Sequence, residues 1–475
     1  MLQYVVAGFM LDRLRAAWRT LTSPLTTGRS IAWDAAGAGS RLQQWAPPST
    51  AFATNLTAPM LKERARDLYR NNPWARRLVD SLVVGAVGGG IKPQVRIGDA
   101  DLKQRVQAEW LAWTDQADFA GRFDFYGLQQ AALRAMLIDG ECFLRFVLDP
   151  AQRVPLQLQL LPSEFLDATR IDDRTLNGIE YDAAGRRVAY WIYRSHPAET
   201  PDMQSVRVPA DQVIHLYVPI QPGVERGVTW LAPAMVPLRE LQEFTEAALV
   251  RQKIASLFCG YVQTADGSSL LNQTNAPPAL EPGAMTRLQP GEAVEFTEPP
   301  DVGQTYEPFV RQHLRAIASA LNVPYETAGN DVSAVTYASG RHALLEYQRH
   351  LESLQHHVLV FQLCRPVWAA WTRAAMAAGV LPEGDYSTVR WIAPRLQMLD
   401  SRMEVQSIIQ QIRGGLLSRS EAVSAMGWDV EQIDSEIAAD NARADALGLV
   451  FDSDARRRTQ QGQDVPVPAE QGAEQ

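Results

Sequence analysis

The chain has 475 residues, of which 46% are hydrophobic and 21% are charged, and its net charge is −9. The length is too great for one compact core and predicts two or three lobes, while the composition is that of a folded soluble protein. The negative charge argues against a protein that wraps nucleic acid tightly, because such affinity comes from neutralising phosphates. It leaves open a protein that lets nucleic acid pass without holding it.

Residues 1–58 are expected to form an N-terminal arm and linker. The first twenty residues are apolar but lack a basic stretch before the apolar part, so they favour an amphipathic helix over a secretory signal. A stretch rich in Gly, Ala, Ser and Pro follows. No run in the chain reaches the roughly 18 apolar residues of a membrane span, and we expect no membrane partner. The three cysteines, Cys142, Cys259 and Cys364, lie far apart, which favours a reducing compartment over a disulfide framework or a cysteine metal site.

Helical periodicity begins near Met60 and predicts two helices broken at residues 71–73. Five arginines near Trp74 could form a nucleic-acid patch, but nearby acidic residues favour a solvated helix face. These arginines are Arg64, Arg66, Arg70, Arg76 and Arg77. The glycine-rich residues 85–90 follow a helix and lack a following Lys-Ser or Lys-Thr, so a tight turn into a strand is favoured over a phosphate cradle.

Two further helices are expected at residues 102–120 and 125–139, after which the hydrophobic period changes to two. Short alternating runs separated by turns predict an antiparallel sheet. These runs are residues 142–148, 156–161, 179–182, 188–193 and 213–217. Asp139 and Glu141 could act as the paired carboxylates of a hydrolase, but the sequence places no second acid or base beside them. A helix-to-strand corner is therefore favoured.

A long helix is expected after residue 226, with Pro237 in its first turn. A Pro/Gly-rich insertion with a short strand at residues 293–296 follows, and then an amphipathic helix from residue 306. Pro324 ends that helix.

A polar loop follows Pro324, and a long helix of about ten turns begins near Ser339. Its apolar seam is predicted at Leu344, Tyr347, Leu351, Leu354, Val358 and Phe361, and Gln355 is assigned to another face. From the residues alone, the polar loop is a surface connection between packed helices.

Three separated runs resemble the bacteriophage portal proteins of the lambda-like family. They are RARDLYRNNPWARR (64–77), IEYDAAGRRVAYWI (179–192) and YASGRHALLE (337–346), and they occur in the order of the family. The resemblance extends from about residue 60 to 380. One departure is Thr336, which stands where the family usually has Asn before the Tyr, so a hydrogen-bonding role of that Asn is not carried over.

The resemblance implies an α+β portal fold with an antiparallel β-containing wing, a helical stem with an inserted clip, and a C-terminal helical crown. The wing would be residues 59–225, the stem helix 226–260, the clip 261–305 and the returning stem helix 306–323. The tunnel loop and long helix would be 324–384, the crown 385–453, and a disordered tail 454–475.

The resemblance also implies a ring of twelve copies at one capsid vertex, through which DNA is packaged and ejected. Its partners would be the terminase motor, the major capsid or scaffold protein, head-completion and connector proteins, and double-stranded DNA bound non-specifically. No cofactor or metal is expected. The location would be the virion, and the host cytoplasm during assembly.

The candidate site is then the loop Ala328–Ala338, which would project into the channel and stay mobile until neighbours or DNA hold it. Its proposed contact residues are Asn330, Asp331, Ser333, Thr336 and Tyr337. Repeated around a ring, Asp331 would give a band of negative charge that prevents a tight grip on DNA.

Two other classes of protein are considered. A hydrolase using Asp139 and Glu141 would be complete as a monomer or small oligomer with a concave polar pocket. A capsid or tail structural protein without a channel is disfavoured by the helix–insertion–helix order. The chain has no Walker A, GxSxG, HExxH or GxGxxG motif, so we expect no ATPase, nuclease or hydrolase activity.

Overall fold

The computed structural model describes residues 51–199, 204–256, 260–264, 292–296, 306–333, 335–394, 401–426, 428, 430–451, 454 and 456. Of these it describes backbone alone at 51–57, 254–256, 260–264, 292–296, 401, 404 and 425. Internal contacts separate Met1–Thr54 from Asn55–Gln475, and apart from the first residues of one helix, all described residues belong to the second unit. The predicted N-terminal helix, most of the predicted clip and most of the predicted tail lie outside the described residues.

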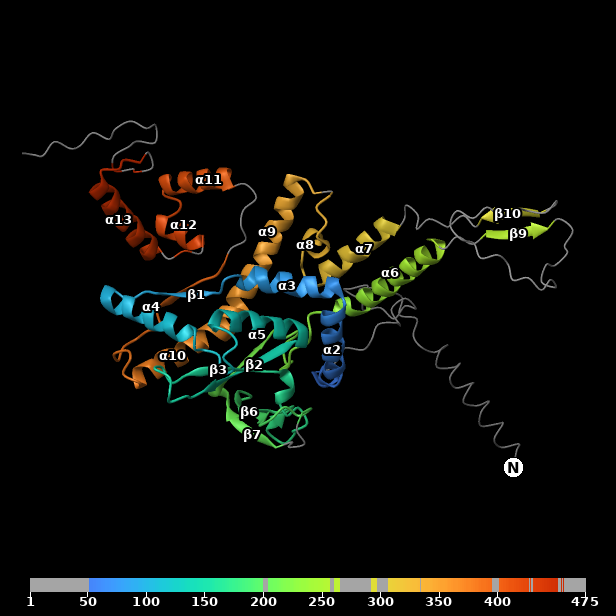
Figure 1. The fold of residues 1–475 in the computed structure, drawn as a ribbon. Helices are drawn as coiled ribbons and strands as arrows, with labels where there is room; N and C mark the ends of the chain where they lie inside the picture. Colours follow the sequence, from blue (N-terminus) through green and yellow to red (C-terminus); the bar gives the residue numbers. More distant parts are fainter. Residues whose placement is uncertain are drawn as a thin grey trace, which may run out of the picture. The chain divides into compact units, whose positions relative to one another are not determined.

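The predicted helix break and glycine turn are both present (Figure 1). Helix α2 (Ala51–Asn71) is followed by α3 (Pro73–Val87), and the side chain of Asn72 accepts hydrogen bonds from the backbone of Trp74 and Ala75. Asparagine followed by proline is a typical helix start, because the amide oxygen satisfies free backbone N–H groups. After α3, Gly88 and Gly90 have φ of 46° and 100°, and the chain turns into β1 (Lys92–Val95).

Helices α4 (Ala100–Thr114) and α5 (Phe125–Asp139) bring aromatic side chains into the main core. Trp110 lies 5.4 Å from Phe125, 4.9 Å from Trp368 and 5.1 Å from Trp371, measured between ring centroids. Tilted and edge-on rings at these distances pack favourably. The tryptophans of α4 are therefore core residues.

The predicted antiparallel sheet is present as two sheets. One has three strands in the order β3-β2-β8 and the other has four in the order β4-β5-β6-β7, and all neighbours are antiparallel. The first consists of β2 (Glu141–Val147), β3 (Gln157–Leu161) and β8 (Val213–Tyr217). The second consists of β4 (Thr175–Leu176), β5 (Ile179–Tyr181), β6 (Arg187–Tyr193) and β7 (Ser205–Pro209).

The three-stranded sheet is buried on both faces. Because successive side chains of a strand point to opposite faces, Cys142 and Leu144 of β2 join the main core with the helices, whereas Phe143 joins a second core. That second core contains Ile179 and Tyr190 of the four-stranded sheet. A sheet packed on both faces explains why β2 and β8 contain long apolar runs.

Helix α6 (Met235–Ser256) and helix α7 (Tyr306–Ala320) lie on either side of the predicted insertion. They pack through Phe244, whose ring centroid lies 4.7 Å from Phe309 and 5.7 Å from Tyr306. Within the insertion, β9 (Gly260–Thr264) pairs antiparallel with β10 (Glu292–Phe296), so the predicted short strand is confirmed. The stem and clip roles of these elements stay predictions.

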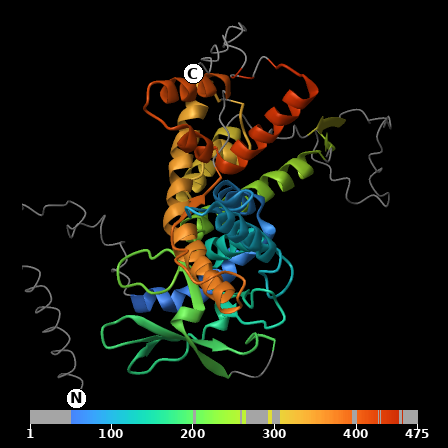
Figure 2. The same cartoon turned by 90° about the vertical axis from the view of Figure 1, so that its left-hand side faces the viewer.

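The long helix is one continuous helical run in three parts, as Figures 1 and 2 show. Helix α9 (Tyr337–Leu354) continues into a π-helical segment (Gln355–Cys364) and then α10 (Arg365–Ala377). A short helix, α8 (Tyr325–Gly329), precedes the run.

The π-helical segment corrects the predicted seam. Tyr347, Leu351, Leu354 and Val358 are buried as expected, but Phe361 is 61% exposed and Val360 is buried in its place. A π-helix closes its hydrogen bonds five residues apart instead of four, so it rotates the following residues relative to an α-helical pattern. Gln355 is also buried, and its Nε2 donates to the backbone oxygens of Ala86 and Pro394 at 2.9 Å each.

The C-terminal part begins with β11 (Val389–Ile392), which pairs antiparallel with β1. Three helices follow: α11 (Ser401–Arg413), α12 (Arg419–Ala425) and α13 (Val430–Leu447). Ser418 caps α12 by accepting from the backbone N–H of Glu421. Single-turn 3-10 helices occur at Ser163–Phe165, Ala210–Gln212 and Ala232–Ala234. Among the described residues, no helix is both long and apolar enough to cross a membrane.

Candidate functional site

The predicted channel loop is shorter than the sequence indicates. Ala328 and Gly329 belong to α8, and Tyr337 and Ala338 belong to α9, so the irregular segment is Asn330–Thr336. Asn330 ends α8 in the left-handed conformation with a φ of 52°. Asparagine tolerates this conformation better than most residues.

Thr336 begins α9. Its side chain accepts from the backbone N–H of Ser339, and the Ser339 hydroxyl in turn accepts from the backbone N–H of Thr336. Threonine and asparagine are both good residues at this position. Thr336 thus caps the helix, as an asparagine could at the same position. This explains how the chain can have Thr where the resemblance leads one to expect Asn.

Asp331 makes several contacts within the loop and at its base. Its carboxylate accepts from the Tyr325 hydroxyl at 2.8 Å and from the Ser333 hydroxyl and backbone N–H at 2.6 and 3.0 Å. It also lies 3.3 Å from the guanidinium of Arg311 on α7. The hydrogen bonds from Ser333 and Tyr325, together with Arg311, lower the pKa of Asp331 to about 2.

The expected band of negative charge stays a prediction, because Arg311 is shared between Asp331 and Glu307 and does not neutralise both. Asp331 remains ionised, but a cation of the same chain lies beside its carboxylate. The side chains of Asn330, Ser333, Thr336 and Tyr337 are exposed, as is that of Val332, which is 71% accessible. The loop thus presents amide, hydroxyl, phenol and apolar groups to its surroundings.

The base of the loop is tied to α3. Arg77 Nε donates to the backbone oxygen of Thr327 at 3.0 Å, and the Tyr347 hydroxyl donates to the backbone oxygen of Ser81 at 2.9 Å. Of the predicted arginine patch, Arg64 and Arg70 are exposed, and Arg76 lies 3.7 Å from Asp80. These three side chains lie on the surface, and the solvated-face interpretation stays a prediction for them.

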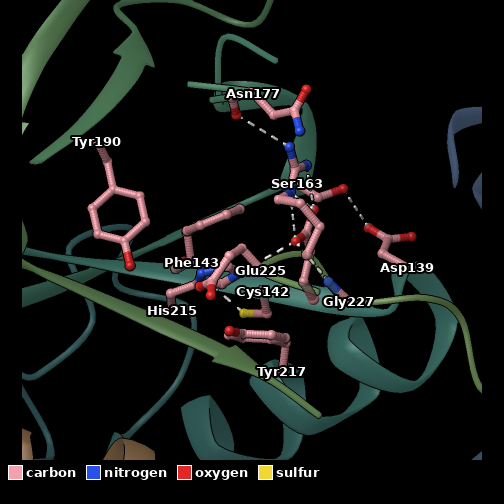
Figure 3. A network of polar contacts seen from close by, with 12 residues as sticks. Asp139, Cys142, Phe143, Ser163, Asn177, Tyr190, His215, Tyr217, Glu225 and Gly227 are labelled. Atoms are coloured by element: carbon pink, nitrogen blue, oxygen red, sulfur yellow. Dashed lines mark hydrogen bonds and ion pairs between the residues drawn. The ribbon is translucent and has the colours of Figure 1, made fainter. Parts of the chain in front are cut away.

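Arg66 instead points toward a buried polar cluster that the sequence does not predict. We define the Glu141 cluster as Lys62, Arg66, Asp139, Glu141, His215 and Arg226. Figure 3 shows the part of this cluster that includes Asp139 and His215. Glu141 is 1% exposed, and the guanidinium of Arg226 contacts both of its oxygens. Lys62 Nζ lies 3.5 Å from Glu141 Oε1.

His215 completes the Glu141 cluster. Its Nε2 lies 3.1 Å from Glu141 Oε2, and its ring is stacked between Phe143 and Tyr217 at centroid distances of 4.4 and 4.3 Å (Figure 3). Burial lowers the pKa of His215 to about 4, although Glu141 opposes this change. At neutral pH the imidazole is therefore neutral, and its Nε2–H donates to the carboxylate.

Burial and neighbouring cations have opposite effects on the pKa of Glu141. Burial raises its pKa, but the charge and hydrogen bonds of Arg226, with smaller contributions from His215 and Lys62, hold the pKa well below its usual value. Asp139 is bound by both Nε and Nη2 of Arg66, at 2.8 and 2.6 Å. Both carboxylates of the hydrolase hypothesis are therefore bound by cationic side chains, Asp139 by Arg66 and Glu141 by Arg226.

The corner between the two carboxylates is tight. Gly140 has a φ of 92°, and the backbone of Val228 and Thr229 fills the space that a Cβ would occupy. This helix-to-strand corner confirms the interpretation favoured by the sequence. The sequence places no base beside the pair, because Lys62, His215 and Arg226 come from distant segments. No local spacing could reveal them.

Chemically, the Glu141 cluster supports the fold. It ties α2, the start of β2, β8 and the Arg226–Gly227 segment together, and its charged groups are paired, as buried charges must be. No group of three or more metal-ligating side chains occurs among the described residues.

These features define a protein of mixed helices and antiparallel sheets. Its exposed polar loop follows a segment that is hydrogen-bonded to α3. The chain belongs to the lambda family of phage portal proteins, whose family model matches residues 38–355. It is similar to the probable portal protein of Halomonas phage phiHAP-1, with 23% identity over 421 residues that cover 82% of this chain and 81% of that protein. It is also similar to portal protein B of Escherichia phage lambda, with 20% identity, covering 90% and 93%.

A similar fold occurs in a chain from the neck of a native gene transfer agent particle, a structure computed with C12 symmetry. The TM-score is 0.50 at 18% identity, covering 78% of this chain and 93% of that one. The predicted family and the α+β fold class are thereby confirmed.

Proposed function

We propose that twelve copies of this chain form a ring at one capsid vertex and that double-stranded DNA passes through its channel during packaging and ejection. Membership of the portal family carries this proposal. The C12 symmetry of the similar neck chain supports the number of copies. In such a ring the contacts are heterologous and close only if each interface has the right rotation.

We further propose that the loop Asn330–Thr336 and Tyr337 line the channel. Hydroxyl and amide groups at Asn330, Ser333, Thr336 and Tyr337 suit contact with a passing DNA backbone, because they can hydrogen-bond without fixing register. Asp331 adds negative charge that Arg311 partly offsets. This arrangement favours weak, non-specific contact, in keeping with the net charge of −9.

The individual binding partners and the location of the protein are part of the same proposal. Residues 261–305 are inserted between α6 and α7 and would dock the terminase motor. Head-completion proteins and the capsid or scaffold protein would bind elsewhere on the ring. The protein would reside in the virion and, during assembly, in the host cytoplasm. It would have no enzymatic activity, because Asp139 and Glu141 are already engaged by Arg66 and Arg226.

A charge reversal in the loop tests the proposal. In a phage supplied with the variant protein, Asp331→Lys should shorten the DNA packaged per particle, because a lysine can bind phosphates and is repelled by Arg311. Asp331→Asn is the matched control, since it removes the charge but can still accept hydrogen bonds from Tyr325 and Ser333. It should package nearly normal lengths. Normal packaging by particles that contain the lysine ring would mean that the loop does not meet the DNA.

A further inference from the structure

The long helical run exposes a side chain at every fourth position from Tyr337 onward. Ten successive members of this series are exposed, through α9, the π-helical segment and α10. We define the helix row as Tyr337, Arg341, Leu345, Arg349, Ser353, His357, Phe361, Arg365, Ala369 and Arg373. The row begins at the residue that follows the loop Asn330–Thr336, so it continues the exposed surface of that loop along the run.

The π-helical segment keeps the helix row at the surface. On an α-helix, four residues turn about 40° beyond one full turn, so a long row with this spacing would circle the helix and enter the core. A π-helix closes its hydrogen bonds five residues apart and holds more residues in each turn, so the same steps fall short of a full turn there. His357, Phe361 and Arg365 thus stay exposed, whereas Val358 and Val360 are buried.

The helix row is cationic and contains no acidic residue, although the chain has a net charge of −9. Its charges are those of Arg341, Arg349, Arg365 and Arg373. Within the described residues, none of these four guanidinium groups forms an ion pair with a carboxylate. Arg373 Nε donates to the backbone oxygen of Ala369 at 3.1 Å, and the Arg365 guanidinium lies 5.9 Å from the centroid of the Phe361 ring.

The acidic residues near the helix row do not neutralise it. Glu346 lies 3.9 Å from a histidine of α9, and Glu352 accepts a hydrogen bond from a glutamine one turn before it. Glu421 lines the same groove as Arg365, but its carboxylate lies 2.8 Å from the guanidinium of Arg390. The four arginines of the row therefore remain available to an anion from outside the chain.

Separated arginines with aromatic and hydroxyl groups between them suit a phosphate backbone. A guanidinium presents a planar fork of donors that matches phosphate oxygens, and hydroxyl groups can donate to them as well. Arg341 and Arg349 are eight residues apart, as are Arg365 and Arg373, which corresponds to about 12 Å along a helix. Such widely spaced contacts attract a duplex without reading its sequence or wrapping it tightly.

We propose that the helix row contacts the phosphate backbone of double-stranded DNA and forms a basic track that continues from the loop along the channel wall. This inference rests on the proposed ring and channel. DNA is the fitting occupant because the row offers positive charge to a polyanion. It also begins where the proposed channel loop ends.

Binding of a short blunt-ended DNA duplex to assembled rings of the full chain tests the inference. Arg349→Gln combined with Arg365→Gln should weaken binding roughly tenfold at low salt. The slope of log Kd against log salt should fall by about 2 or more, since each lost phosphate contact removes about one. Arg64→Gln combined with Arg70→Gln is the matched control, because it removes the same charge from exposed residues of α2. It should change the affinity less than about twofold.

Three results of this comparison would overturn the helix row as a DNA contact. The first is unchanged binding by the row variant, and the second is an equal loss in the control. The third is a row variant that keeps its unfolding free energy in urea but no longer forms rings, because the row would then contact another protein chain.

Photocross-linking in DNA-filled particles locates the contact without removing a charge. Benzoyl-phenylalanine replaces Tyr337, Phe361 or, as a control away from the row, Phe119, which is 51% exposed. We expect cross-links to DNA at positions 337 and 361 and none at 119. Cross-links at 337 without 361 would overturn the helix row and leave the channel proposal intact. Cross-links at neither position would contradict the channel proposal and the helix row with it.

Discussion

At the scale of single residues, His215 makes the stability of this protein depend on pH. The pKa of its imidazole falls from an ordinary 6.5 to about 4 in the folded chain, because burial disfavours the charged form. The unfolded chain therefore takes up a proton first on acidification. Stability is fully present above pH 6.5 and is lost as the pH falls toward 4.

The predicted loss is on the order of 3 kcal/mol, at about 1.4 kcal/mol for each unit of pKa change. Urea unfolding at a series of pH values measures it, and His215→Gln is the control because glutamine does not titrate. The variant should show a shallower decline of unfolding free energy between pH 6.5 and 4. Parallel curves for the variant and the natural chain would show that His215 does not titrate as its surroundings indicate.

The residue scale also shows what sequence can and cannot predict of a site. The N-cap roles of Asn72 and Ser418 follow from nearest neighbours, because a cap acts within one turn of helix. The partners of Glu141 do not, since Lys62, His215 and Arg226 lie 79, 74 and 85 residues away and meet it only after folding. The partners of Asp331 are of both kinds: Ser333 is two residues away in the chain, whereas Arg311 lies on α7.

At the scale of elements, the helices and most strands of residues 59–225 were predictable, because their apolar periods are local. The second sheet was not, since the face on which a strand packs depends on distant segments. The π-helical segment was also missed, because an α-helical seam can be drawn through residues 344–361 without any visible break.

The π-helical segment gives a matched pair of substitutions. Val360→Gln should destabilise the chain by about 2–4 kcal/mol, because it places an amide in the packed core. Phe361→Gln should cost well under about 1 kcal/mol, since Phe361 is 61% exposed. An α-helical seam predicts the opposite order. Urea unfolding of the two variants measures which of them loses more unfolding free energy. A greater loss for Phe361→Gln would contradict the π-helical register.

At the scale of the whole molecule, the chain exposes groups that suit contact with other molecules. The loop Asn330–Thr336 is exposed, and helices α11 and α13 also expose large apolar side chains. Membership of the portal family motivates the ring proposed above. In that proposed ring, every copy would present its loop to the channel.

Electron microscopy of the purified protein tests this central claim most directly. We expect class averages viewed along the axis to show a ring with a central hole and twelvefold rotational symmetry. Mass measurement of the same sample should give about twelve times the 52.7 kDa of one chain. Particles that remain monomeric at the concentrations used for assembly, or closed particles without a central hole, would contradict the claim that this chain builds a DNA channel.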